Sequence, residues 1–177
     1  MTQLRGIVRA AAQGKVRALY PMVASVEDLE AVLELFERAR QELEEEGVVP
    51  AEPIEHGVMV EVPSAVYVLP ELLERCDYVS VGTNDLVQYV LAAGRNSDRM
   101  AEAYDTYHPA VLRILNQICS EAAERDRPVG VCGEAAADSH FIPILLGMGY
   151  RSLSVNFGTI PYVKRAVRKL DLGACRE

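Results

Sequence analysis

Short apolar runs alternate along the chain with longer segments in which apolar residues recur every three or four positions. Short apolar runs separated by helical segments are typical of strands that are covered on both faces in a parallel sheet. We therefore predict five strands. In chain order they are Val16–Val23, His56–Val62, Asp77–Val81, Pro128–Cys132 and Ser152–Val155.

The longer segments predict helices between these strands. The helix after the first strand has the clearest start, because Ser25 followed three residues later by Asp28 matches a capping box, and Gly47 ends it. Pro70 interrupts a later helical segment, where we expect a kink or a break. Residues Gly82–Asp85 form a polar stretch that we interpret as a loop. The other predicted helices are Leu4–Ala12, Ala65–Arg75, a segment that begins at Pro109, His140–Met148 and Ile160–Leu170.

This order of elements predicts an α/β fold with a parallel sheet built from about five βα units. No linker divides the chain, so we expect residues 1–177 to form a single domain. A complete (β/α)₈ barrel takes about 250 residues and eight units. We therefore expect an incomplete barrel that lacks roughly three units.

Composition and charge exclude several classes of protein. Half of the residues are apolar and a quarter are charged, which is ordinary for a globular protein, and the net charge of −8 with dispersed basic residues argues against nucleic-acid binding. No apolar run approaches a membrane span, and the first residues do not resemble a signal peptide, so we expect a cytoplasmic protein with no membrane role. The four cysteines are scattered, which favours neither a zinc site nor a disulfide framework.

Polar side chains gather where the predicted strands end. Glu61 lies at the end of the second strand, Asn84 and Asp85 follow the third, and Cys132 and Glu134 lie at the end of the fourth. In parallel α/β folds these ends form the functional site. Two carboxylates on neighbouring strands suit Mg²⁺ or Mn²⁺, with water and substrate oxygens as further ligands. The alternative is that Glu61 begins a loop and Asp85 caps a helix.

Two arginines and one thiol add to this candidate site. Arg17, within the first strand, and Arg95 would suit phosphate or carboxylate oxygens, although an isolated arginine is more often a surface residue. Cys132 would be a small buried residue in most strands of this kind. If its thiol opens into the cavity, an acid role is favoured over a nucleophilic one, because no histidine lies near it in the sequence.

Three motifs occur in a fixed order: MVEVPSA around Glu61, VSVGTNDLVQYVLAAGRNSD from the third strand onward, and GVCGEAAAD around Cys132. Together they resemble the C-terminal barrel of the phosphoenolpyruvate (PEP)-utilising enzymes, which include pyruvate phosphate dikinase, PEP synthase and Enzyme I of the bacterial phosphotransferase system. The resemblance runs from about Leu4 to about Leu170. The stretch LLGMGYRSLSVNFGTIPYVKRAVRK is most similar to Enzyme I, and RNSDRMAEAYDTYHPAVLRIL resembles its nitrogen-related form.

The resemblance implies the C-terminal part of a TIM (β/α)₈ barrel and assigns roles within it. Glu61 and Asp85 would bind Mg²⁺, and Cys132 would protonate the methylene carbon of enolpyruvate to give pyruvate. The residues that would bind PEP are Arg17, Asn84, Asp85 and Arg95.

The resemblance also implies partners and further domains. In such a PEP–protein phosphotransferase, phosphoryl passes from PEP to a histidine on another domain and then to a phosphocarrier protein, in sugar transport or a related branch. Neither the phosphohistidine domain nor the carrier-binding domain is recognisable in this chain. None of His56, His108 and His140 lies in the phosphohistidine motif, so we expect the chain alone to be inactive.

Two alternatives remain open from the sequence. The chain would serve as a non-catalytic dimerisation or regulatory module if its exposed sheet edges favour association into a homodimer. It would be a small magnesium-dependent lyase acting on pyruvate or oxaloacetate if Glu61 and Asp85 serve a complete enzyme. That lyase would leave the Cys132 loop and the Asn84–Asp85–Leu86 motif without an explanation.

Overall fold

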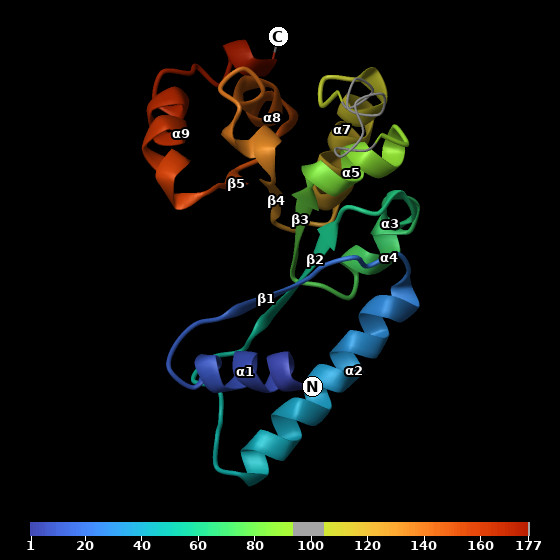
Figure 1. Cartoon of the computed structure of the whole chain (residues 1–177), viewed down its shortest axis with the longest axis vertical. Coiled ribbons are helices and arrows are strands. Elements are labelled where there is room, and N and C mark those ends of the chain that lie inside the picture. The colour runs from blue at the N-terminus through green and yellow to red at the C-terminus, as the bar shows by residue number, and fades with distance from the viewer. Residues whose placement is uncertain (94–104, 177) are drawn as a thin grey trace.

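The five predicted strands are all present and form one parallel sheet, as the computed structural model of the chain shows for residues 1–93 and 105–176 (Figure 1). Each strand is hydrogen-bonded to the next one along the chain, in the order β1-β2-β3-β4-β5. The strands are β1 (Arg17–Tyr20), β2 (Glu55–Val60), β3 (Tyr78–Gly82), β4 (Val129–Cys132) and β5 (Ser152–Ser154).

The sequential strand order identifies the type of α/β fold. A doubly wound sheet reverses its strand order at a switch point, whereas a barrel wall keeps the order of the chain. Within the described residues β1 and β5 each pair with one neighbour only, so the sheet stays open. The fold class predicted from the sequence, a parallel sheet with an incomplete barrel, is therefore confirmed.

The helices lie between the strands as the pattern predicts, with one difference. The break predicted near Pro70 is confirmed, because the helical segment at 65–75 is two short helices that meet at Val68. The predicted loop Gly82–Asp85 is instead the end of β3 followed at once by the first turn of α5. The helices are α1 (Thr2–Ala11), α2 (Val26–Glu45), α3 (Pro63–Tyr67), α4 (Leu69–Leu73), α5 (Thr83–Val90), α7 (Pro109–Glu124), α8 (Ile142–Met148) and α9 (Ile160–Val167), with 3₁₀ turns η1 (Glu134–Ala137), η2 (Phe157–Thr159) and η3 (Ala174–Arg176).

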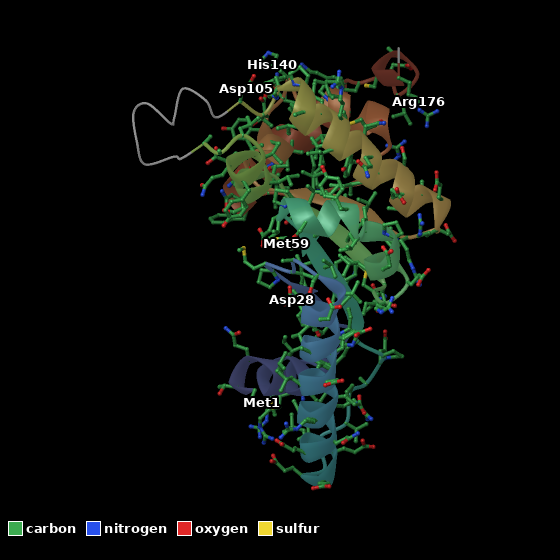
Figure 2. All side chains as sticks on the ribbon, turned by 90° about the vertical axis from the view of Figure 1, so that its right-hand side faces the viewer. Met1, Asp28, Met59, Asp105, His140 and Arg176 are labelled. Carbon is green, nitrogen blue, oxygen red and sulfur yellow. The ribbon has the colours of Figure 1, made fainter. Side chains whose placement is uncertain are left out.

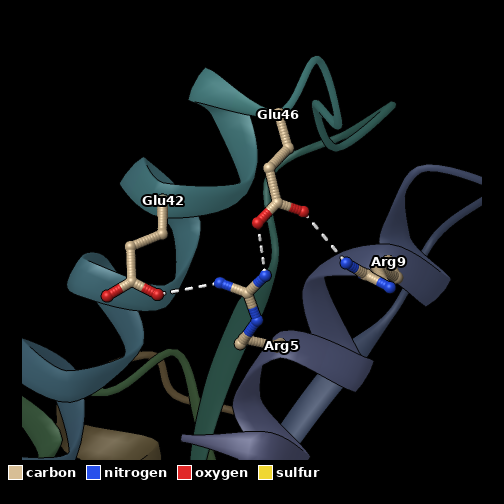
Figure 3. Close-up of polar contacts among 4 residues, drawn as sticks. All are labelled: Arg5, Arg9, Glu42 and Glu46. Carbon is tan, nitrogen blue, oxygen red and sulfur yellow. Dashed lines mark hydrogen bonds and ion pairs between the residues drawn. The ribbon is translucent and has the colours of Figure 1, made fainter.

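Helix α2 begins with the predicted capping box. The Ser25 hydroxyl accepts from the Asp28 backbone N–H at 3.3 Å, and the Asp28 carboxylate accepts from the Ser25 N–H at 3.0 Å. At its other end α2 is joined to α1 by exposed ion pairs (Figure 3): Arg5 reaches Glu42 at 2.8 Å, and Arg9 reaches Glu46 at 3.0 Å. These contacts add to the packing of α1 against α2, and the two helices lie on the β1 side of the sheet (Figure 1).

The two faces of the sheet differ in chemistry because side chains alternate along each strand. One face carries apolar residues that are buried among helical side chains. They are Ala18, Tyr20, Val58, Val60, Val79, Val81 and Val131. The other face carries Leu19, Tyr78 and Met59 (labelled in Figure 2), together with small or polar residues. These are Gly57, Ser80, Gly82, Gly130, Cys132, Ser152 and Ser154. In a barrel wall, helices cover the outer face and the inner face turns to the axis.

None of the helices in the described part of the chain is both long and apolar enough to cross a bilayer.

Candidate functional site

Glu61 is a buried carboxylate at the carboxyl end of β2. Its residue is 4% exposed, and it directly follows the last strand residue, Val60. One carboxylate oxygen, Oε1, accepts a hydrogen bond of 2.7 Å from the backbone N–H of Met22, just beyond β1. Met22 has a φ of +56°, a left-handed conformation that is uncommon for a residue other than glycine. The end of β1 is thus bent to present an N–H to Glu61.

The neighbouring strand makes room for this carboxylate. Gly82 ends β3 beside Glu61, and a Cβ at position 82 would lie 2.7 Å from Glu61 Oε2 and 2.9 Å from Glu61 Cβ. Any larger residue at position 82 would therefore have to displace the Glu61 side chain. The close approach of the two strand ends depends on the missing side chain of Gly82.

Asp85 provides a second carboxyl group close to the first. It lies in the first turn of α5, which follows β3 without a loop. Burial raises the pKa of the Glu61 carboxyl, and the charge and hydrogen bond of Asp85 raise it further. The hydrogen bond from Met22 lowers that pKa in opposition. The two carboxyl groups therefore repel as anions, and a proton or a cation between them would relieve the repulsion.

Glu61 and Asp85 together suit a hard divalent cation that also binds water and substrate oxygens. In the described residues, no group of three or more His, Cys, Asp or Glu side chains is arranged to enclose a metal. Mg²⁺ in proteins that handle phosphate is commonly held by one or two carboxylates, with the remaining positions filled by water and substrate oxygens. Glu61 and Asp85 match that requirement in type, number and charge.

Cys132 is the last residue of β4 and lies next to Gly82 in the sheet. Its thiol donates to the carbonyl of Val81 at 3.3 Å. Burial raises the pKa of the Cys132 thiol, and a hydrogen bond with Ser80 lowers it in part. At neutral pH the group therefore keeps its proton, as an acid must and as a thiolate nucleophile would not.

Asn84 and Cys132 line a cavity of about 580 Å³. Glu134, Ser154 at the end of β5 and Asn156 just beyond it also line that cavity. The Asn84 side-chain oxygen accepts the Glu134 backbone N–H at 3.0 Å. That bond assigns the orientation of the amide and leaves its NH₂ group as the one that can donate to a bound anion.

The carboxyl ends of β2, β3 and β4 thus bring together two carboxyl groups, one amide and one protonated thiol. Residues 1–172 match the model of a protein family described as PEP-utilising enzyme, PEP-binding domain. The chain belongs to this family. The family predicted from the three motifs is therefore confirmed.

Curated relatives of this PEP-binding domain are longer proteins. The chain is 42% identical over 176 residues to multiphosphoryl transfer protein 1 of Escherichia coli K12, covering 99% of the chain and 21% of that protein. It is 44% identical over 174 residues to a phosphoenolpyruvate-dependent phosphotransferase system protein of Salmonella typhimurium, covering 97% and 23%. It is 35% identical over 170 residues to the phosphoenolpyruvate-protein phosphotransferase of Lactococcus lactis subsp. cremoris, covering 96% and 30%. The chain spans less than a third of each.

Solved structures with a similar fold include citrate lyases. The crystal structure of a citrate lyase from Burkholderia xenovorans has a TM-score of 0.70 and 20% identity, over 99% of this chain and 58% of that one. Protein CitE of Mycobacterium tuberculosis, solved with magnesium and acetate, has a TM-score of 0.53 and 13% identity, over 91% and 62%. At these identities the likeness shows the fold alone.

Of the two predicted arginines of the PEP-binding domain, Arg17 is described, and it lies away from the cluster. Arg17 is the first residue of β1, at the amino end of the sheet, whereas the cluster lies at the carboxyl ends. It forms an ion pair of 2.7 Å with Glu55 and stacks 3.8 Å from the ring centroid of Tyr78. Arg95 lies outside the described residues.

Several groups at the site were not predicted from the sequence. Thr83 is 1% exposed, and its hydroxyl donates to the Cys132 carbonyl at 2.9 Å. The Met22 N–H and the space at Gly82 both hold Glu61 in place. A glycine and a threonine beside a strand end suggest a turn, so the sequence contains no pattern that would have identified these contacts.

Proposed function

We propose that this chain is the magnesium- and PEP-binding part of a PEP–protein phosphotransferase. In that reaction phosphoryl passes from PEP to a histidine on another domain and then to a phosphocarrier protein. The observation that carries the proposal is the carboxyl pair Glu61 and Asp85, which lies at the same strand ends as Asn84 and Cys132. The names of the relatives support the reaction class, and their greater length supports an acceptor histidine in parts that this chain does not span. That the chain belongs to the nitrogen-related form rather than the sugar-related one stays a prediction.

Glu61 and Asp85 are the proposed metal ligands. Both are anionic oxygen donors, and the burial that raises the pKa of Glu61 also makes a cation favourable there. When bound, Mg²⁺ would offset the negative charge of the phosphoryl group and of the enolate that remains. Two fold neighbours from M. tuberculosis, protein CitE and a citrate lyase beta subunit, were solved with magnesium, which is consistent with this proposal.

Asn84 and Cys132 are proposed to act on the organic part of the substrate. The Asn84 NH₂ group would donate to an anionic oxygen of PEP, because its carbonyl oxygen is already bound to Glu134 N–H. After phosphoryl loss, the Cys132 S–H would give its proton to the methylene carbon of the enolate. That step forms the methyl group of pyruvate and leaves a thiolate, which must regain a proton before the next turnover.

The arginines have different places in the proposal. Arg95 stays the proposed ligand of the substrate carboxylate or phosphate. Arg17 is left out of the proposed site, because it lies at the amino end of β1 and pairs with Glu55. We therefore expect Arg17→Gln to leave metal binding unchanged.

Binding of Mn²⁺, a paramagnetic substitute for Mg²⁺, tests the proposal directly. Electron paramagnetic resonance of free Mn²⁺ should show one site on the native chain and its loss in Glu61→Gln and in Asp85→Asn. Glu55→Gln is the matched control, because it removes a carboxylate at the amino end of the same strand. Retention of the site in Glu61→Gln, or its equal loss in Glu55→Gln, would refute the assignment.

A further inference from the structure

The turn after β4 is fastened to the start of α5 by two neighbouring side chains. The Thr83 hydroxyl donates to the Cys132 carbonyl at 2.9 Å, and the Asn84 amide oxygen accepts the Glu134 N–H at 3.0 Å. Thr83 is almost fully buried, so the hydroxyl has no access to bulk water. A buried hydroxyl that loses its acceptor, or a buried carbonyl that loses its donor, is costly. The pair therefore favours one geometry of the turn.

Gly133 allows the turn to lie directly on these side chains. Its φ of +96° belongs to the region that favours glycine, and a Cβ there would lie 2.5 Å from Thr83 Oγ1 and 2.9 Å from Asn84 Oδ1. The chain thus leaves β4 in contact with the Thr83 hydroxyl. The turn therefore lies directly against the first residues of α5.

The same junction also holds the thiol. Cys132 Sγ donates to the Val81 carbonyl, and Val81 lies two residues before Thr83. Two residues at the junction of β3 and α5 therefore hold Cys132. Thr83 binds its carbonyl, and Val81 binds its sulfur. A shift of the carbonyl would rotate the Cα–Cβ bond and move the thiol relative to the cavity.

We propose that Thr83 is a positioning residue whose hydroxyl fixes the direction of the Cys132 thiol at the cavity. The chemical meaning of that direction rests on the proposed function, in which Cys132 is the proton donor. Thr83 does not touch the substrate in this proposal; it acts through the Cys132 carbonyl. A threonine that is merely a satisfied buried residue would stabilise the domain as a whole without any particular effect on Cys132.

The test compares Thr83→Val, which keeps the shape and removes the hydroxyl, with Thr83→Ser, which keeps the hydroxyl. The readout is the rate at which iodoacetamide alkylates Cys132 at one fixed pH, resolved from the other cysteines by peptide mass spectrometry. Cys119, a buried residue of α7, is the internal control for general loosening. We expect Thr83→Val to raise the Cys132 rate by about fivefold, the effect of one lost hydrogen bond on local opening. Cys119 should be unchanged and Thr83→Ser should resemble the native chain.

Three outcomes of the alkylation experiment would overturn the proposal. They are an unchanged Cys132 rate in Thr83→Val, an equal rise at Cys119, and a Thr83→Ser variant that behaves like Thr83→Val. Mn²⁺ binding should be retained by Thr83→Val, and its loss would show that the hydroxyl instead orders the first turn of α5 around Asp85. Alkylation needs neither PEP nor metal, so failure of the proposed function would leave this result readable.

Discussion

The surroundings of Glu61 disfavour the charged form of its carboxyl group. It is buried, and Asp85 is close enough to raise its pKa. Such a carboxylate destabilises the folded chain unless a cation or proton accompanies it. Its position is consistent with selection for binding rather than for stability, as is common for residues at functional sites.

Replacing Glu61 by Gln should therefore stabilise the metal-free chain. Gln keeps an oxygen for the Met22 N–H and removes the charge, so the free energy of unfolding should rise by roughly 1 kcal/mol, with Tm higher by about 2–4 °C. Thermal unfolding in a chelator measures this, with exposed Glu34→Gln on α2 as the control. A Tm that falls below that of the native chain would contradict the account.

Met22 offers a second prediction at the same site. Its left-handed backbone suits glycine and disfavours β-branched residues, and its side chain is 53% exposed, so little packing is lost on replacement. Met22→Val should cost about 1–2 kcal/mol of unfolding free energy. Met22→Gly should lie close to the native value because the Glu61 hydrogen bond is made by the backbone. Urea unfolding of both variants decides the matter: equal costs would show that the conformation at Met22 is not strained.

At this scale the sequence predicted the polar residues but not their supports. Glu61, Asn84, Asp85 and Cys132 are brought together because they end neighbouring parallel strands, which period and order can reveal. The Met22 N–H and the Thr83 hydroxyl act through local backbone geometry that has no counterpart in residue type. Arg17 illustrates the opposite case. Its side chain suits phosphate, but it lies at the amino end of its strand, whereas the site lies at the carboxyl ends.

Among the elements, β1, β2 and α2 meet at His56. Its ring lies between Tyr20, whose hydroxyl is 2.8 Å from Nδ1, and Phe36, which it meets edge-on. Burial lowers the pKa of His56, while the charges of Asp77 and Glu37 raise it in opposition. His56 is therefore harder to protonate in the folded chain than in the unfolded chain.

This difference predicts a loss of stability in acid. His56 contributes no penalty above its unfolded pKa near 6.5, and the penalty grows as the pH falls through that value toward the lower folded pKa. Urea unfolding at roughly pH 7.5 and pH 5.5 should show a smaller acid loss for His56→Phe than for the native chain. Groups that do not interact with His56 titrate equally in both proteins. The same loss in both would remove His56 as its source.

Element boundaries show what the sequence determines and what the tertiary fold adds. The capping box at Ser25 and the break before Pro70 follow from local chemistry and were predicted. The first turn of α5 was predicted as a loop, because Gly82, Thr83 and Asn84 are typical turn residues. The helix forms there because β3 must connect directly to the packed residues Leu86 and Val87.

For the whole molecule, the open sheet has consequences of its own. β1 and β5 each leave one edge without a described neighbour, and an apolar groove of about 630 Å³ lies beside β1, lined by residues that include Leu4, Leu19 and Leu35. Unpaired edges beside apolar surface favour association. The order of the five strands was predictable from the sequence. The described residues leave the sheet open rather than closed into a barrel.

We therefore expect the chain to associate at micromolar concentration. Light scattering should give a mass above that of one chain, and Leu35→Lys, which places a charge in the groove, should shift it toward the monomer. Val49→Lys is the control, because Val49 is 57% exposed and lies outside that groove. A monomer at every concentration would remove association from the account.

The central claim is that this chain binds PEP through a metal held by Glu61 and Asp85. Isothermal titration of PEP into the native chain, with and without Mg²⁺, tests it most directly. We predict binding heat that requires Mg²⁺ and disappears in Glu61→Gln but persists in Glu55→Gln. PEP binding of equal affinity without Mg²⁺, or in Glu61→Gln with Mg²⁺, would contradict the claim.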